Sequence, residues 1–165
     1  SDVGSETLVT KADSVRENVY VDSLVNVEGD FDGSGRTVNG HCVPPFTHPP
    51  EGYCRVCSAY VVFGGAIDTL RYPWPTTDLA LFNVGDVNGD GADDLLVIDT
   101  WPTSCWGRQA VFSYKARVWT PLINGSIYRC NLRNTVHRMD DGTFVMDEDV
   151  IDPYTMATAE RVIPK

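Results

Sequence analysis

Glycine and proline are spread along the whole chain and leave few stretches in which a helix could form. The 165 residues include 14 Gly and 10 Pro, and both residue types interrupt helices. Only about residues 5–17 and 154–163 have room for a short helix. The stretches between them are rich in Val, Ile, Tyr and Phe, which favour strands; examples are Asn18–Val21, Ser58–Phe63, Leu95–Ile98 and Ala110–Tyr114. The sequence therefore predicts a mainly β fold of antiparallel sheets in one small compact domain, residues 1–165.

The net charge disfavours two classes of partner. Asp and Glu number 23 against 13 Lys and Arg, which gives a formal charge of −10. Such a field repels nucleic acids and anionic lipid surfaces. We expect a partner with a basic surface instead, and no nucleic acid. No run approaches the ~18 apolar residues of a membrane span, so we expect no span either.

The expected location is extracytoplasmic, either secreted or periplasmic. Five cysteines in a chain with three lysines favour an oxidising compartment, although buried free thiols are the alternative. Ser1–Glu6 show neither the basic start nor the apolar run of a signal peptide, so we expect that an export signal has been removed.

An odd number of cysteines allows at most two intramolecular disulfides and leaves one thiol over. The sequence alone does not choose among the possible pairs. We expect Cys42 to pair with Cys54 or Cys57, and Cys105 to pair with Cys130.

The segment of residues 39–57 differs in amino-acid composition from the rest of the chain, with four prolines, three cysteines and two histidines. It resembles a loop held by cross-links, which disulfides or a zinc ion in a Cys₃His arrangement could supply. A second Cys-x-x-Cys pair is absent, and this favours disulfides. The zinc donors in the alternative would come from His41, Cys42, His48, Cys54 and Cys57.

Two segments of the chain resemble each other. Leu24–Gly35 aligns with Leu81–Gly91 after a slip of one residue, and each reads as a strand that enters an acidic, glycine-rich turn. A third acidic turn, Asp140–Gly142, lacks the rest of the pattern, and we expect it to be a plain hairpin turn.

The later acidic turn carries the strongest functional signal. Oxygen-bearing side chains occupy alternate positions at Asp86, Asn88 and Asp90 and then Asp94, while Ala92 offers its backbone carbonyl. Ca²⁺ takes six to eight oxygen ligands, and alternate residues of a curled loop can point their oxygens to one centre. Carboxylates held together repel one another unless a cation separates them. These five residues are therefore the predicted Ca²⁺ ligands, with an empty Asx-rich turn as the alternative.

Residues 86–97 resemble the calcium loop of FG-GAP repeats, found in the β-propeller blades of integrin α-chains and in VCBS-type bacterial proteins. Both have the pattern Asp-x-Asp/Asn-x-Asp-Gly-x-x-Asp followed by an apolar strand. The resemblance implies propeller-blade-like repeats, here two units at about 18–70 and 76–120 followed by a C-terminal β segment. The chain has room for about three blades where such propellers need about seven, so it either closes differently or borrows the loop.

The earlier acidic turn is a degraded copy. Asp30, Asp32 and Ser34 occupy the first three ligand positions, but Arg36 and Val38 occupy the next two. One carboxylate is missing, and the positively charged side chain of Arg36 stands in the loop. A weak or vacant second ion site and an occupied one both remain open.

No motif of nucleophilic or zinc-protease catalysis is present, since the chain has no Gly-x-Ser-x-Gly and no His-Glu-x-x-His. We expect His137 to be a surface or hydrogen-bonded histidine. The acidic runs could serve glycoside hydrolysis, but in an acidic protein such runs usually form solvated faces or calcium sites. They are Asp93–Asp94, Asp140–Asp141 and Asp147–Asp149.

Aromatic residues in the proline-containing segments Tyr72–Pro75 and Trp101–Trp106 could either anchor a partner or cap the ends of the core. The leading hypothesis is an exported, calcium-binding module without catalysis, which binds a glycan or a protein, including an enzyme that it inhibits. The alternatives are a secreted hydrolase that uses clustered carboxylates, and a structural fragment of a larger propeller or adhesin.

Overall fold

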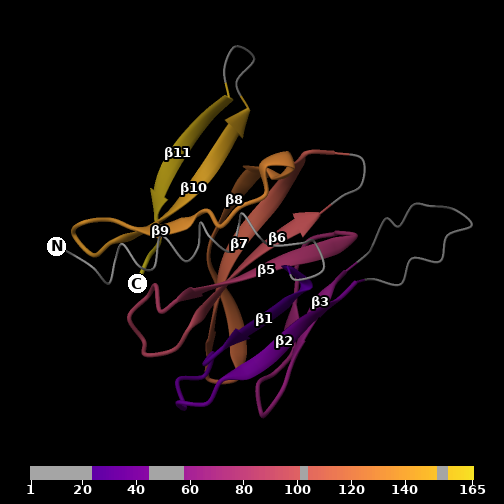
Figure 1. Cartoon of the computed structure of the whole chain (residues 1–165), viewed down its shortest axis with the longest axis vertical. Helices are drawn as coiled ribbons and strands as arrows, with labels where there is room; N and C mark the ends of the chain where they lie inside the picture. Colours follow the sequence, from indigo (N-terminus) through magenta and orange to yellow (C-terminus); the bar gives the residue numbers. More distant parts are fainter. Residues whose placement is uncertain (1–23, 45–57, 101–103, 152–155) are drawn as a thin grey trace, which may run out of the picture.

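The computed structural model describes residues 24–44, 58–100, 104–151 and 156–165. These residues form a mainly β structure with three antiparallel sheets (Figure 1), which confirms the fold class predicted from the sequence. Within these ranges there is no helix long and apolar enough to cross a membrane. Residues 5–17, Asn18–Val21 and Trp101 lie outside the described residues.

The first two sheets have four strands each, and in both the strands neighbour one another in chain order. The first sheet consists of β1 (Asn26–Gly29), β2 (Val38–Val43), β3 (Tyr60–Phe63) and β4 (Leu70–Arg71). The second consists of β5 (Asp78–Gly85), β6 (Asp94–Thr100), β7 (Trp106–Lys115) and β8 (Val118–Tyr128). In each sheet an acidic loop joins the first strand to the second.

The third sheet consists of β9 (Val136–Arg138), β10 (Phe144–Ile151) and β11 (Met156–Val162) in the order β11-β10-β9. The short 3₁₀ helix η2 (Arg129–Asn131) leads to it from β8. The helix considered at residues 154–163 is wrong, because β11 pairs with β10 from Met156↔Ile151 to Val162↔Val145. The turn at Asp140–Gly142 joins β9 to β10 through a hydrogen bond from Met139 N–H to Thr143 O (2.7 Å), as expected of a hairpin.

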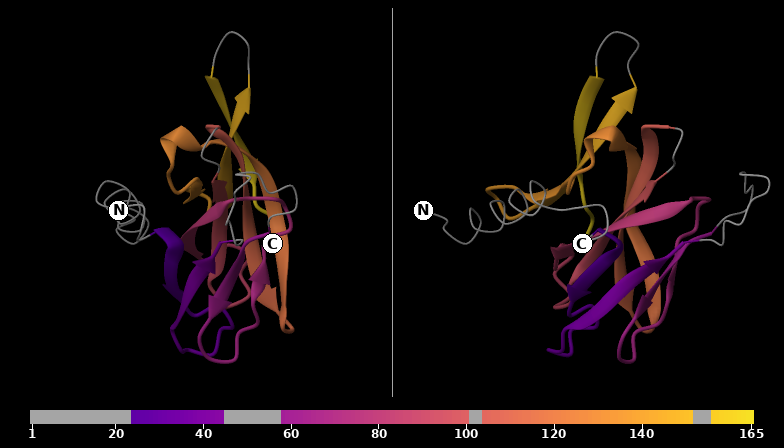
Figure 2. Two further views of the ribbon diagram at one scale, coloured as in Figure 1. Left: turned by 90° about the vertical axis from the view of Figure 1, so that its right-hand side faces the viewer. Right: turned by 45° about the vertical axis from the view of Figure 1, so that its right-hand side comes forward.

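The second sheet lies between two cores, and its central strands β6 and β7 are buried on both faces. Leu95 and Val97 face a core shared with the first sheet, whereas Leu96 and Ile98 face a core shared with the third. A strand covered on both sides reads as a continuous apolar run, which explains the sequence of β6. Figure 2 shows the first sheet beside the second, and β10 and β11 extending beyond both.

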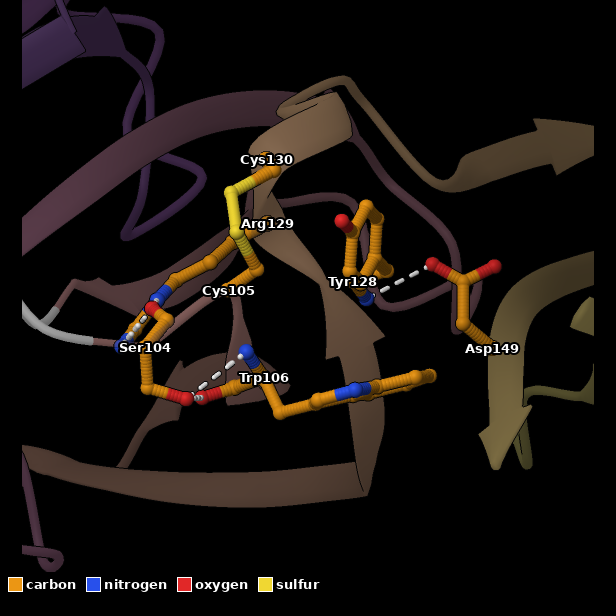
Figure 3. The surroundings of a disulfide bond; sticks show 7 residues. All are labelled: Ser104, Cys105, Trp106, Tyr128, Arg129, Cys130 and Asp149. Carbon is orange, nitrogen blue, oxygen red and sulfur yellow. Dashed lines mark hydrogen bonds between the residues drawn. A yellow bond between two sulfur atoms is a disulfide. The ribbon is translucent and has the colours of Figure 1, made fainter. Parts of the chain in front are cut away.

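A disulfide joins Cys105 to Cys130 (Figure 3), as expected. It links the start of β7 to η2, and beside it the buried Arg129 guanidinium pairs with Asp99 (3.1 Å). The expected disulfide of Cys42 is wrong: Cys42 is a free, buried thiol whose Sγ lies 3.3 Å from Asp78 Oδ1. Cys54 and Cys57 lie outside the described residues.

Candidate metal centre

The later acidic loop connects β5 to β6 at one end of the middle sheet. Carboxylate oxygens of Asp86, Asp90 and Asp94 lie within 4.8 Å of one another. Asp90 is exposed, Asp86 is partly buried and Asp94 is buried. The three carboxylates predicted from the sequence as cation ligands are therefore brought together in space.

The loop is curled by its own first side chain. Asp86 Oδ1 accepts hydrogen bonds from the backbone N–H groups of Gly89 (2.8 Å) and Asp90 (3.1 Å), and Oδ2 accepts one from Gly91 (2.8 Å). Gly89 and Gly91 have φ of 78° and 86°, which side chains with a Cβ rarely adopt. The Asp-x-x-Gly-x-Gly pattern thus determines the local backbone and turns the later carboxylates toward the first.

Asp94 is the most unusual member of the cluster. Its side chain is buried, and Oδ2 accepts a hydrogen bond from Val87 N–H (2.9 Å). Its Oδ1 is also buried but has no hydrogen-bond partner. Burial, together with the nearby Asp90 charge, raises the pKa of Asp94 to about 6. A buried carboxylate oxygen without a donor costs free energy, and a cation between the three carboxylates would remove this cost.

The two remaining predicted ligands also lie in this loop. Asn88 Nδ2 donates a hydrogen bond to Ser113 Oγ (3.1 Å), and Ala92 N–H donates one to Asp90 Oδ1 (3.0 Å). Ser113, on β7, donates in turn to Asp90 Oδ2 (3.3 Å), so it connects the loop to the sheet. We did not identify Ser113 as part of this site from the sequence. The only signal for it in the sequence is that a polar residue stands within an apolar strand.

The earlier acidic loop, between β1 and β2, has the same local geometry. Gly35 N–H bonds to Asp30 Oδ2 (2.9 Å) and Ser34 N–H to Asp32 Oδ1 (3.1 Å), which repeats the pattern of the later loop. Asp30 Oδ1 is buried without a partner. Val38, however, stands where the later loop has Asp94, so only two carboxylates are present. A second ion at this loop stays a prediction.

The two loops are joined directly. Asp93 N–H donates to Asp30 O (2.8 Å), and Asp30 N–H donates to Asp93 Oδ2 (2.9 Å). Asn83 bridges Asp93 Oδ2 (3.0 Å) and Glu28 O (2.8 Å). A hollow lies beside the two loops, next to the β7–β8 turn; its lining is Asp32, Ala66, Asp90, Ala92, Tyr114, Lys115, Ala116 and Arg117.

Other residues singled out in the sequence are placed apart from this centre. His41 is exposed and Cys42 buried at successive positions of β2, so they face opposite sides and do not share a metal ion. His48 lies outside the described residues. Tyr72 is buried and its hydroxyl donates to Asp99 (3.0 Å), and Trp74 packs against the first core. Both aromatic side chains of this segment therefore cover the first core, and a role of Trp74 as an anchor for a partner stays a prediction.

No family model, curated protein or solved structure matches the chain. The likeness of residues 86–97 to an FG-GAP calcium loop stays a resemblance of sequence.

Proposed function

We propose that this chain is an exported, calcium-binding module without catalysis, which binds another macromolecule beside the loops that the ion shapes. The observation that carries the proposal is the buried, unpartnered Oδ1 of Asp94 next to two further carboxylates. Ca²⁺ prefers carboxylate, amide and carbonyl oxygens, and the predicted set Asp86, Asn88, Asp90, Ala92 and Asp94 offers these groups.

The proposed docking place is the hollow beside the two loops. Asp32 and Asp90 reach it from the two loops, and the joined backbones of Asp30 and Asp93 connect those loops. An ion in the later loop would therefore make both loops that line the hollow more rigid. With a net charge of −10, the chain would steer toward a partner with a basic surface, either a protein or a basic group on a glycan.

The acidic runs favour binding over hydrolysis, because each of them has at least one carboxylate that is hydrogen-bonded within the fold. Asp93 holds the earlier loop, Asp141 accepts from Thr143 N–H (2.9 Å), and Glu148 accepts from Ser126 N–H (2.9 Å). Asp149 accepts from Tyr128 N–H (2.8 Å). The Cys105–Cys130 disulfide supports an oxidising, extracytoplasmic location.

Thermal unfolding with EDTA and with millimolar Ca²⁺ tests the calcium site. A ligand at 100 times its Kd stabilises the folded state by about 2.7 kcal/mol, so we expect a rise in Tm of about 5–10 °C for a chain of this size. Asp90→Asn keeps the shape of the side chain but removes a ligand charge, and it should lose most of that rise.

Asp140→Asn is the matched control, because Asp140 is exposed in the β9–β10 turn away from the loop. It should respond to Ca²⁺ as the wild type does. An unchanged Tm of the wild type in Ca²⁺, or an equal rise in Asp90→Asn, would contradict the proposal.

A further inference from the structure

A second group of metal-binding side chains lies on the third sheet, where each strand supplies one. His137 comes from β9, Asp147 from β10 and Glu160 from β11. His137 Nε2 lies 2.9 Å from Asp147 Oδ1 and 3.6 Å from Glu160 Oε2, and the three donor atoms all lie within 4.8 Å of one another. Asp147 follows His137 by ten positions and Glu160 follows Asp147 by thirteen, so the fold brings together residues that are distant in the sequence.

The strand register explains the meeting. Asp147 pairs directly with Glu160 across β10 and β11, and His137 pairs with Val145, two residues before Asp147. Their neighbours Val136 and Met146 are buried in the second core. Because side chains alternate along a strand, the group lies on the other face of the sheet, where its side chains are 26–52% exposed.

The group has an electrostatic cost without a cation. Two carboxylates directly opposite each other on neighbouring strands destabilise a sheet. Asp147 and Glu160 form such a pair, and His137 Nε2 faces both of them. A cation bound between them, with neutral His137 as a nitrogen ligand, would turn the repulsion into attraction.

We propose that His137, Asp147 and Glu160 form a binding site for a divalent transition metal ion of the zinc class. Tetrahedral zinc with bonds of about 2.0–2.2 Å separates its ligand atoms by about 3.3–3.6 Å, and the distances of 2.9 and 3.6 Å from Nε2 need only small adjustments to match. One imidazole and two carboxylates suit zinc better than Ca²⁺, which takes oxygen ligands alone. The fourth position is open to water.

Bound zinc would connect all three strands of this sheet. β9 has three residues and only three register pairs with β10. An ion held by β9, β10 and β11 would therefore add a cross-link where the sheet has few backbone hydrogen bonds. This site is independent of the calcium loop, and either can exist without the other.

Isothermal titration of the full chain with ZnCl₂ tests the site, with millimolar Ca²⁺ present to fill the acidic loop. We expect one zinc ion to bind at this group. Its association constant should fall at least tenfold in His137→Gln and in Glu160→Gln. His41→Gln and Glu28→Gln are the matched controls, because both residues are exposed on the first sheet. Both controls should bind zinc as the wild type does.

Absorption of the Co²⁺-loaded chain gives a second readout that does not depend on heat. Intense visible bands, absent from His137→Gln, are expected of four-coordinate Co²⁺ at this group. If the wild type binds no zinc, the proposal fails and the contacts of His137 with the two carboxylates belong to the fold alone. It also fails if His137→Gln or Glu160→Gln binds zinc with wild-type affinity, or if His41→Gln loses it. Circular dichroism of each variant checks that the fold is retained.

Discussion

Asp94 places a carboxylate at the start of β6, where water is excluded. Its side chain is fully buried, with one oxygen bonded to Val87 N–H and the other without a partner. The ionised form therefore loses hydration that the single hydrogen bond does not replace. The same features that make this residue costly in the free protein would make it a strong ligand for a cation.

We expect Asp94→Asn to have opposite effects with and without calcium. The pKa of Asp94 is raised from 3.8 to about 6 by burial, so the folded state holds the proton more tightly than the unfolded state. In EDTA the stability of the wild type should fall as the pH rises from about 4 to 6 and stay low above that. Asn has no charge, so the variant should lack this fall.

At pH 7.5 in EDTA, Asp94→Asn should therefore be more stable than the wild type, by about 1–3 kcal/mol. In millimolar Ca²⁺ the order should reverse, because the variant lacks a ligand charge. Urea unfolding at pH 4.5 and 7.5 measures both effects. A variant that is less stable than the wild type in EDTA at pH 7.5 would show that the buried charge is not the cost inferred here.

Individual residues were predictable from the sequence where the contacts are local. Asp86, Asp90 and Asp94 belong to one loop, so their spacing was enough to predict that they meet. Ser113 joins them from β7, and the group of His137 with two acids needs the register of three strands. The spacing of residues along the chain does not reveal which residues face each other on neighbouring strands.

At the scale of elements, the turn between β7 and β8 has an unusual backbone. Ala116 and Arg117 have φ of 52° and 64°, and they connect the paired residues Lys115 and Val118. Positive φ at both central residues is typical of the type I′ hairpin turn, which favours Asn-Gly. An alanine in this conformation costs roughly 1–2 kcal/mol. Without a glycine the turn gave no signal in the sequence.

Ala116→Asn should stabilise the protein, because Asn tolerates the left-handed region better than Ala does. We expect a gain of about 0.5–1 kcal/mol, or about 1–4 °C in Tm. Differential scanning calorimetry measures it, with Ala66→Asn as the control, since Ala66 is exposed and lines the same hollow without a positive φ. No gain over this control would contradict the assigned turn conformation.

Other elements were predictable to different degrees. The sequence correctly predicts the acidic turn at Asp140–Gly142 as a hairpin, because Asp and Gly define such a turn locally. Residues 156–162 allowed a helix by composition, yet they form β11 because β10 offers a partner along their whole length. The pairing is a tertiary effect, and tertiary contacts routinely override local propensity.

At the scale of the whole molecule, the middle sheet makes the two cores depend on each other. Leu95 and Val97 face the first core and Leu96 and Ile98 face the second. The same short stretch of backbone must therefore be ordered for either core to form. Burial on both faces was not inferred from the sequence, because a short apolar run does not reveal what covers it.

We expect the described sheets to unfold as one cooperative unit, which Met146→Ala tests. Met146 is fully buried in the second core, so the change should cost about 2–5 kcal/mol. If the middle sheet couples the cores, amide hydrogen exchange at Val61 in the first core should lose as much protection as exchange at Val136 in the second. Val162→Ala, on the same sheet but 64% exposed, should change neither. Loss of protection confined to the third sheet would instead mean that this sheet unfolds alone, and that the middle sheet needs only its first face covered to persist.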